Sequence, residues 1–138
     1  MGNVHGDFDT TVTLEADRNL NIRHNALEAA RMTSNKHLEK ALGRKGYFLK
    51  IRTYPFHVMR ENPLASGAGA DRMSTGMKKS FGKIIGAAAR VKSGQVILEV
   101  RVPKSQLKVA RQALKRASAK FSCTGKIRTT ETKVVPAQ

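Results

Sequence analysis

AAARVKSGQVILEVRV, residues 87–102, is the stretch from which the fold of this chain is most directly predicted. It contains two strand-forming runs, residues 87–91 and 96–102, separated by the four residues Lys92-Ser93-Gly94-Gln95. Strand-forming runs that flank a short turn with a glycine are typical of a β-hairpin. We therefore expect a hairpin over residues 87–102.

Three segments on the N-terminal side of this stretch also have the pattern of strands. TTVTLEA, residues 10–16, alternates apolar with polar residues, which predicts a strand buried on one face. In YFLKIRTY, residues 47–54, the same alternation puts Lys50 and Arg52 on the face that is expected to be exposed to solvent. After a proline, residues 56–61 can resume extended structure.

Two other segments have the apolar spacing of helices. The first covers residues 21–42 and ends before Gly43, and the second covers residues 104–121 after Pro103. The opposite surface of the second helix carries cations, which either contact phosphate or are the solvated side of a packed helix. These cations are Lys104, Lys108, Arg111 and Lys115.

Length and composition predict one domain over residues 1–138. The chain has 138 residues and is 40% hydrophobic, which suits one modest core. A closing strand is expected over residues 126–135, with a few frayed residues after it. Together the segments predict an α+β fold with two helices.

A glycine-rich basic loop is predicted over about residues 62–86. Its centre is GAGADRMSTGMKKSFGK, residues 67–83, and the loop holds five of the eleven glycines but a single acid, Asp71. Long loops in small domains are usually functional or disordered, and the charge of this one favours a polyanion as partner. A surface loop without a partner is the alternative. Its cations are Arg72, Lys78, Lys79 and Lys83.

The charge of the chain points to nucleic acid. Lys and Arg number 26 against 10 acids, which gives a formal net charge of +16 and a pI near 10.7. Such an excess indicates a polyanionic partner, either nucleic acid or an anionic membrane surface. No apolar run approaches the roughly 20 residues of a spanning helix, so a membrane is the weaker choice.

The sequence offers little support for catalysis, metal binding or a cofactor. Cys123 is the only cysteine, so no intrachain disulfide can form and a reducing cytosolic setting is expected. The four histidines do not have zinc-ligand spacing, and residues 67–71 lack the lysine and hydroxyl of a phosphate-binding P-loop. His57 could act as a general base in RNA cleavage, although stacking or hydrogen bonding is the more common role.

The side chains predict contacts mainly to phosphate and to RNA shape. Phe and Tyr together number seven and tryptophan is absent, so aromatic platforms for bases are sparse. Arginine can bind phosphate with two parallel hydrogen bonds, whereas lysine is a point charge. The arginines are therefore favoured for specific contacts, chiefly Arg52, Arg60, Arg72 and Arg90.

Four segments in register carry a family resemblance over about residues 1–127. They are IRHNALEAAR (22–31), YPFHVMREN (54–62), GAGADRMSTGMKKSFGK (67–83) and GAAARVKSGQVI (86–97). The chain resembles the universal large-subunit ribosomal protein L-sixteen family, in its archaeal and eukaryotic form L-ten-e. The resemblance implies an α/β-hammerhead-like mixed sheet with two helices packed on it and a long flexible loop.

The resemblance also implies a structural role in the cytoplasmic ribosome. The expected partners are large-subunit rRNA near the central protuberance, tRNA near the aminoacyl and peptidyl sites, and other large-subunit proteins, with no membrane, small-molecule substrate or cofactor. The expected RNA-binding residues are Arg23, His24, Arg31, Arg52, His57, Arg60, Arg72, Lys78, Lys79, Lys83, Arg90 and Lys92.

The chain departs from the family pattern at a few positions. Family members usually have arginine at one or both of the positions of Lys78 and Lys79, and commonly have proline and threonine where this chain has Ile84 and Ala87. The family's basic N-terminal arm is expected to be missing. Two other functions stay open: an RNA-processing or RNA-modifying enzyme that uses His57 and the glycine-rich loop, and a non-ribosomal nucleic-acid-binding or assembly module.

Overall fold

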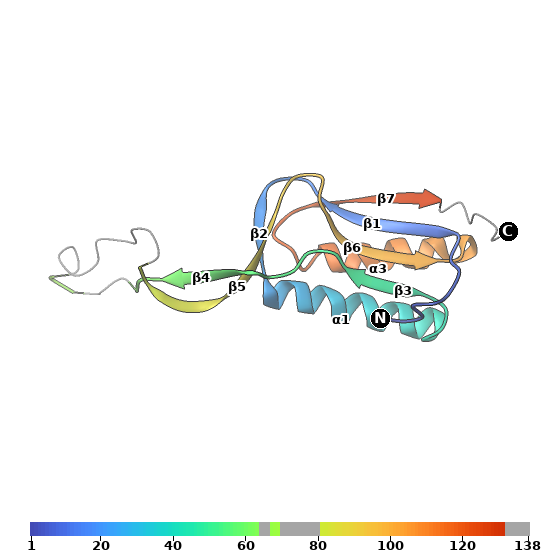
Figure 1. Ribbon diagram of the computed structural model, residues 1–138, viewed down its shortest axis with the longest axis horizontal. Coiled ribbons are helices and arrows are strands. Elements are labelled where there is room, and N and C mark those ends of the chain that lie inside the picture. The colour runs from blue at the N-terminus through green and yellow to red at the C-terminus, as the bar shows by residue number, and fades with distance from the viewer. Residues whose placement is uncertain (64–66, 70–80, 132–138) are drawn as a thin grey trace.

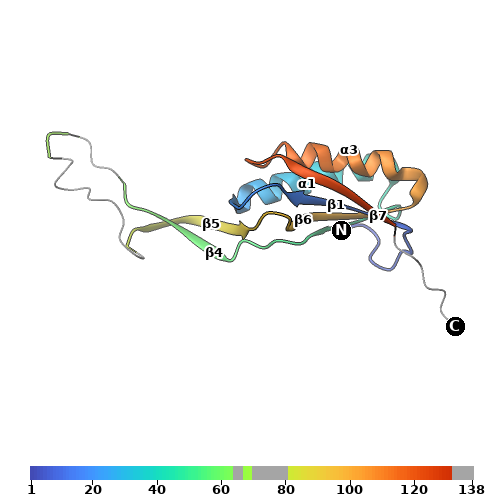
Figure 2. The ribbon, with the colours of Figure 1, turned by 90° about the horizontal axis from the view of Figure 1, so that it is seen from above.

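The computed structural model describes residues 1–63, 67–69 and 81–131. The elements in chain order are β1 (Thr10–Ala16), β2 (Leu20–Arg23), α1 (His24–Leu42), β3 (Phe48–Ile51), β4 (His57–Glu61), β5 (Lys83–Val91), β6 (Val96–Val102), the 3-10 helix η1 (Lys104–Gln106), α3 (Leu107–Ser118) and β7 (Gly125–Glu131). Helices α1 and α3 pack against each other on one side of the strands, and β4 and β5 extend from this body as an arm (Figures 1 and 2).

The strands form two sheets. One has four strands in the order β3-β6-β1-β7, and the other has three in the order β2-β5-β4. Every pair among these strands is antiparallel. The predicted α+β class with two packed helices is therefore confirmed, whereas the single mixed sheet is replaced by two antiparallel ones.

A bent two-stranded ribbon joins the two sheets. One side of the ribbon is β1 followed by β2, and the other side is β5 followed by β6. At the bend, the Ala16 amide donates to the Gln95 carbonyl at 3.0 Å, and the Gly94 amide donates to the Ala16 carbonyl at 2.8 Å. The pairing therefore continues from Glu15 opposite Val96 to Leu20 opposite Val91 across the bend.

The hairpin predicted over residues 87–102 is wrong. β5 pairs with β2 and β4, whereas β6 pairs with β1 and β3. The turn between them does contain a glycine with positive φ, Gly94, but its backbone bonds to the bend after β1 and not across a hairpin. Ser93 adds to this contact, since its amide donates to Asn19 Oδ1 at 2.7 Å and its hydroxyl to the Asp17 carbonyl at 3.0 Å.

The core lies between the helices and the inner face of the four-stranded sheet. Val12, Leu14, Leu98 and Val100 supply the sheet side and are all 0% exposed. On the helices, small residues let α1 and α3 approach closely, because alanine adds little bulk between two backbones. The buried helix residues are Leu27, Ala30, Ser34 and Leu38 of α1, and Ala110, Ala113, Leu114 and Ala117 of α3.

Several predicted boundaries shift for reasons of pairing. The helix expected from residue 21 begins at His24, because Leu20–Arg23 pair with β5. The strand expected over residues 47–54 is shorter, because β3 covers only Phe48–Ile51. The closing strand is β7, and the end predicted for it lies outside the described residues.

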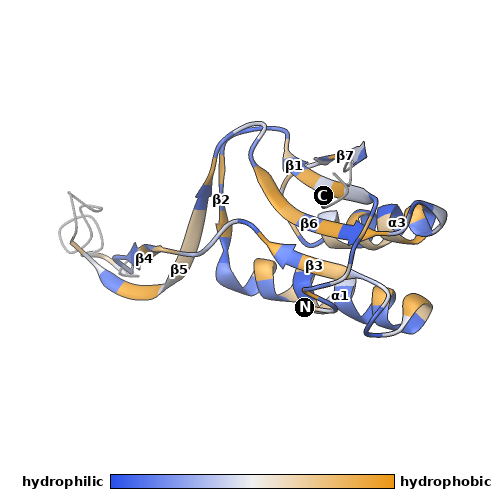
Figure 3. Cartoon of the chain, turned by 45° about the vertical axis from the view of Figure 1, so that its right-hand side comes forward, coloured by the Kyte–Doolittle hydropathy of each residue, from blue (hydrophilic) through white to orange (hydrophobic). Residues whose placement is uncertain are grey.

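The arm is a two-stranded extension beyond the end of β2. β2 reaches only as far as Ala88 of β5, so the part of β5 before Ala88 pairs with β4 alone. Hydrophobic residues nevertheless continue along the arm (Figure 3), and Val58, Ile84 and Ile85 are exposed there. Residues 83–86, predicted as part of the glycine-rich loop, belong to β5. The central part of that loop lies outside the described residues.

We predict that Gly94→Ala lowers the free energy of unfolding by about 1–2 kcal/mol, because an L-residue is strained in the left-handed region. Gly94 has a φ of 80°. The matched control is Gly86→Ala, whose Cβ would meet His24 Cε1 at an ordinary 3.5 Å. This control should leave stability unchanged or raise it by up to about 1 kcal/mol. Chemical denaturation measures both variants, and equal effects would contradict the role given to the bend.

Candidate nucleic-acid interface

Three predicted residues converge at the base of the arm. His57 begins β4, Arg90 lies near the end of β5, and Lys92 follows in the turn. They line a hollow of about 640 Å³, which we call the arm-base hollow. Among the described residues that line it, none is acidic. The remaining lining residues are Asn19, Leu20, Asn21, Val91 and Gln95.

Hydrogen bonds of the bend hold the wall of the arm-base hollow in place. Asn19 accepts from the Ser93 amide, and the Lys92 amide donates to Gln95 Oε1 at 3.0 Å. The side chains of Arg90 and Lys92 are exposed above this wall. Cations next to amides and an imidazole offer several donors to an anionic oxygen and no carboxylate to repel it. The hollow is thus suited to a phosphate group.

Arg23 and His24 lie on the opposite edge of β5 from β4. His24 Nδ1 lies 3.1 Å from the carbonyl oxygen of Ala87. In the pairing of β2 with β5, Arg23 is opposite Ala88, so the next position of the ladder would place His24 opposite Ala87. The imidazole therefore takes the place of a further strand residue after the chain has turned into α1. The ring also lies over Gly86. His24 thus supports the arm, and Arg23 beside it is exposed.

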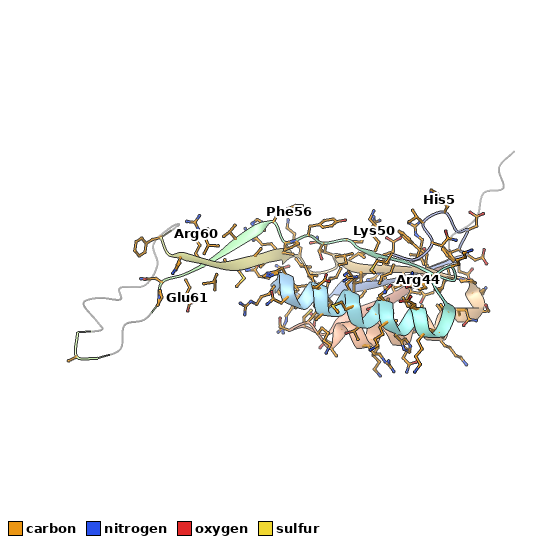
Figure 4. The ribbon with its side chains drawn as sticks, turned by 90° about the horizontal axis from the view of Figure 1, so that it is seen from below. His5, Arg44, Lys50, Phe56, Arg60 and Glu61 are labelled. Carbon is orange, nitrogen blue, oxygen red and sulfur yellow. The ribbon has the colours of Figure 1, made fainter. Side chains whose placement is uncertain are left out.

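Arg60 and Lys83 lie toward the far end of the arm. Arg60 is paired with Ile84, and Lys83 with Glu61, in the ladder between β4 and β5. Figure 4 shows Arg60 and Glu61 at that end, away from the helices. The loop cations Arg72, Lys78 and Lys79 lie outside the described residues. The arm thus carries predicted RNA-binding residues from its base at His57 to its outer end.

Arg31 is held by an acid within its own helix. Its Nε donates to Glu28 Oε2 at 2.9 Å, and a second hydrogen bond joins its Nη2 to Glu28 Oε1. This pairing lowers the pKa of the Glu28 carboxyl and raises the pKa of Arg31. Arg31 is therefore less available to phosphate than the arm-base cations, and it does not line their hollow.

Arg52 belongs to a cationic sheet surface of which the sequence pattern predicted only Lys50 and Arg52. The helices cover one face of the four-stranded sheet, and Arg52, Arg101 and Glu99 lie on the other. Arg52 Nε lies 2.8 Å from Glu99 Oε2 and Arg101 Nε lies 2.7 Å from Glu99 Oε1, although Glu99 itself is only 4% exposed. Lys50 is opposite Glu99 and therefore on the same face.

Arg128 completes this surface, which we call the outer sheet face. Thr13 of β1 has Glu99 opposite it on one side and Arg128 opposite it on the other, so Arg128 lies on the same face as Glu99. Arg128 Nε lies 2.8 Å from Glu15 Oε2. Positive residues outnumber the two acids on this face, so it stays cationic after pairing. Arg101, Lys50 and Arg128 each alternate along their strand with inward-facing neighbours. This period of two is the sequence pattern from which their place on the outer face could be predicted. The outer sheet face consists of Lys50, Arg52, Arg101 and Arg128 with Glu15 and Glu99.

The cationic surface predicted on the second helix is exposed, as expected. Lys104, Lys108, Arg111 and Lys115 are the residues concerned, and Lys104 is paired with Glu131 at 2.8 Å. Arg111 and Lys115 also line a hollow of about 820 Å³ together with Arg18. Arg18 Nη2 donates to the Ser122 carbonyl at 2.7 Å, which fixes its guanidinium at the rim. No local pattern pointed to Arg18, because only the fold brings it to α3.

No metal or membrane site is found in the described part of the chain. No group of three or more His, Cys, Asp or Glu residues there could hold a metal ion. Within the same residues, no helix has the length and apolarity to cross a membrane. Cys123 is buried, and burial raises the pKa of its thiol, which disfavours the reactive thiolate.

Comparison with known proteins identifies the family. The pattern of the ribosomal protein L16p/L10e family matches residues 1–128. The chain belongs to this family. Similar proteins are the large ribosomal subunit proteins uL16 of Staphylothermus marinus (51% identical over 127 residues, 92% of this chain and 73% of the relative), Hyperthermus butylicus (48% over 128 residues, 93% and 71%) and Methanococcus maripaludis (45% over 133 residues, 96% and 77%).

Membership of the L16p/L10e family decides between the broad functional classes. The chain is a structural constituent of the large ribosomal subunit and not an enzyme. The predicted family is thereby confirmed. The alternative enzyme that would use His57 is not supported, because the family is structural.

We predict that Glu99→Ala lowers the free energy of unfolding by about 1–3 kcal/mol, because two neighbouring guanidinium groups lose the carboxylate that separates their charges. Glu99 is buried, and both arginines are about half exposed and can partly rehydrate. The matched control is Glu131→Ala, which breaks the exposed pair with Lys104. It should change stability little. Urea denaturation distinguishes the two, and similar effects would show that Glu99 is not a structural anchor.

Proposed function

We propose that the chain binds large-subunit rRNA near the central protuberance, with the arm-base hollow as its principal contact. The observation that carries this is the convergence of His57, Arg90 and Lys92 on one hollow that no described acidic residue lines. A folded surface of this kind can hold a phosphate between several donors at once, which isolated surface lysines cannot do.

Two further surfaces support a broad contact with RNA. The outer sheet face and the cationic side of α3 lie on different elements, so one chain could contact phosphates of several rRNA segments. A ribosomal protein with a net charge of +16 needs such contacts to relieve its own repulsion. Other large-subunit proteins are expected as neighbours, in the ribosome of the cytoplasm.

The arm suggests a second role, toward tRNA. β4 and β5 hold the two ends of the glycine-rich loop at a distance from the body (Figure 1). We propose that rRNA contacts anchor the base of the arm and that the loop over residues 67–83 reaches the aminoacyl and peptidyl tRNA sites. The mechanism is one of positioning, and no bond is made or broken by the chain.

We predict that Arg90→Ala with Lys92→Ala weakens rRNA binding and makes its salt dependence less steep. The logarithmic slope should fall by about 0.7–0.9 for each phosphate that the variant no longer neutralises. The matched control is Lys36→Ala with Lys40→Ala, which removes the same charge from α1, outside the arm-base hollow. Filter binding to a large-subunit rRNA fragment over a range of salt measures both. Equal effects would mean that total charge, and not the hollow, determines affinity.

We predict that replacing Arg72, Lys78 and Lys79 together with alanine leaves the thermal midpoint nearly unchanged but impairs tRNA-dependent steps. These cations belong to a stretch that is predicted to be a loop, because its composition is too polar for a core. Thermal unfolding and tRNA binding to reconstituted subunits measure the two effects. A large fall in the midpoint would show that the loop is part of the core, and unimpaired tRNA binding would contradict the proposed reach.

A further inference from the structure

Two aromatic rings stand exposed where the chain crosses from the four-stranded sheet to the arm. Tyr54 is 51% exposed and Phe56 is 82% exposed, with Pro55 between them. Their ring centroids are 5.8 Å apart and their planes meet at 41°. A phenylalanine as exposed as this one leaves most of its apolar surface in water, at a cost that burial by a partner would remove.

The backbone keeps the two rings together. The Phe56 amide donates to the Tyr54 carbonyl at 3.0 Å, which closes a tight turn around Pro55. Proline restricts the backbone of this turn further, because its φ is fixed. The rings thus form a pre-organised pair, in which Phe56 leaves an open face for another flat group.

The surroundings of the pair indicate what that flat group is. Phe56 directly precedes His57, which lines the arm-base hollow with Arg90 and Lys92. Phe56 also projects from the strands to the same side as Lys50, away from α1 (Figure 4). An apolar flat surface next in the chain to a cation-lined hollow suits a nucleotide, whose base is a flat ring and whose phosphate is an anion. An apolar protein segment would leave these cations without a counter-charge.

We propose that the Tyr54–Phe56 pair stacks on an unpaired base of RNA while the arm-base hollow holds a neighbouring phosphate. This rests on the proposed rRNA binding and adds base contact to it. Such stacking requires a base that is free of a duplex, so the site selects a single-stranded, bulged or flipped nucleotide. The sparse aromatic content of the chain does not argue against this, since one well-placed pair is sufficient for one base.

The test uses the full chain and three fluorescent RNA probes. These are a short single-stranded oligoadenylate, the same oligomer with abasic riboses, and a duplex of equal length. The variants are Phe56→Leu, which keeps apolar volume without a ring, and Phe56→Tyr, which keeps the ring. Because Phe56 is so exposed, both variants should fold, and thermal unfolding checks this.

The wild type should bind oligoadenylate more tightly than the abasic oligomer. Phe56→Leu should weaken oligoadenylate binding about fivefold or more, a typical effect for one stacked base, with little change for the duplex and abasic probes. Phe56→Tyr should bind like the wild type. Tight binding by Phe56→Leu, or an equal weakening in Phe56→Tyr, would overturn the stacking.

The same experiment separates this inference from the proposed function. If the wild type binds the duplex and an rRNA fragment but shows no preference for bases over abasic riboses, only the stacking is overturned. If Phe56→Leu affects association with large-subunit proteins but no RNA probe, the pair is a protein contact and the inference is wrong. A wild type that binds none of the RNAs would overturn the proposed function as well.

Discussion

Backbone pairing between Ala16 and residues 94–95 governs the arrangement of both sheets. These hydrogen bonds carry the antiparallel pairing through a bend, from β1 with β6 to β2 with β5. Because of this continuity, the arm is joined to the helix-covered body through paired strands. The same bend brings Asn19, Lys92 and Gln95 together, so the arm-base hollow is a direct product of the pairing.

The helices cover the strands from one side only, and this determines where charge can gather. On the covered side, Leu14, Leu98 and Leu114 are fully buried. On the open side, side chains must be soluble, and arginines there surround the buried carboxylate of Glu99. One acid thus organises two cations into a fixed surface. A protein of this charge can fold because its cations lie on exposed faces, where water and counter-ions screen them.

The proposed interface combines a rigid part with an extended part. The rigid part is the arm-base hollow with its hydrogen-bonded wall, next to the exposed Tyr54–Phe56 pair. The extended part begins where β2 ends and β5 pairs with β4 alone. The proposed function uses both parts, since anchoring requires fixed donors and access to a distant site requires length. His24 connects the two, because its ring continues the strand edge from the start of α1.

Local periodicity and contiguous motifs were enough to predict the α+β class, the two helices, most of the strands and the family. His57, Arg90 and Lys92 were also predicted from the sequence as RNA-binding residues, and the fold brings these three to one hollow. That residues 87–102 join two sheets emerged only from the folded chain, because the partners of β5 and β6 are distant in the sequence. The same holds for Arg18 beside Arg111, and for Arg52 beside Glu99. Long-range pairing places such residues together, and no local pattern encodes the choice of partner.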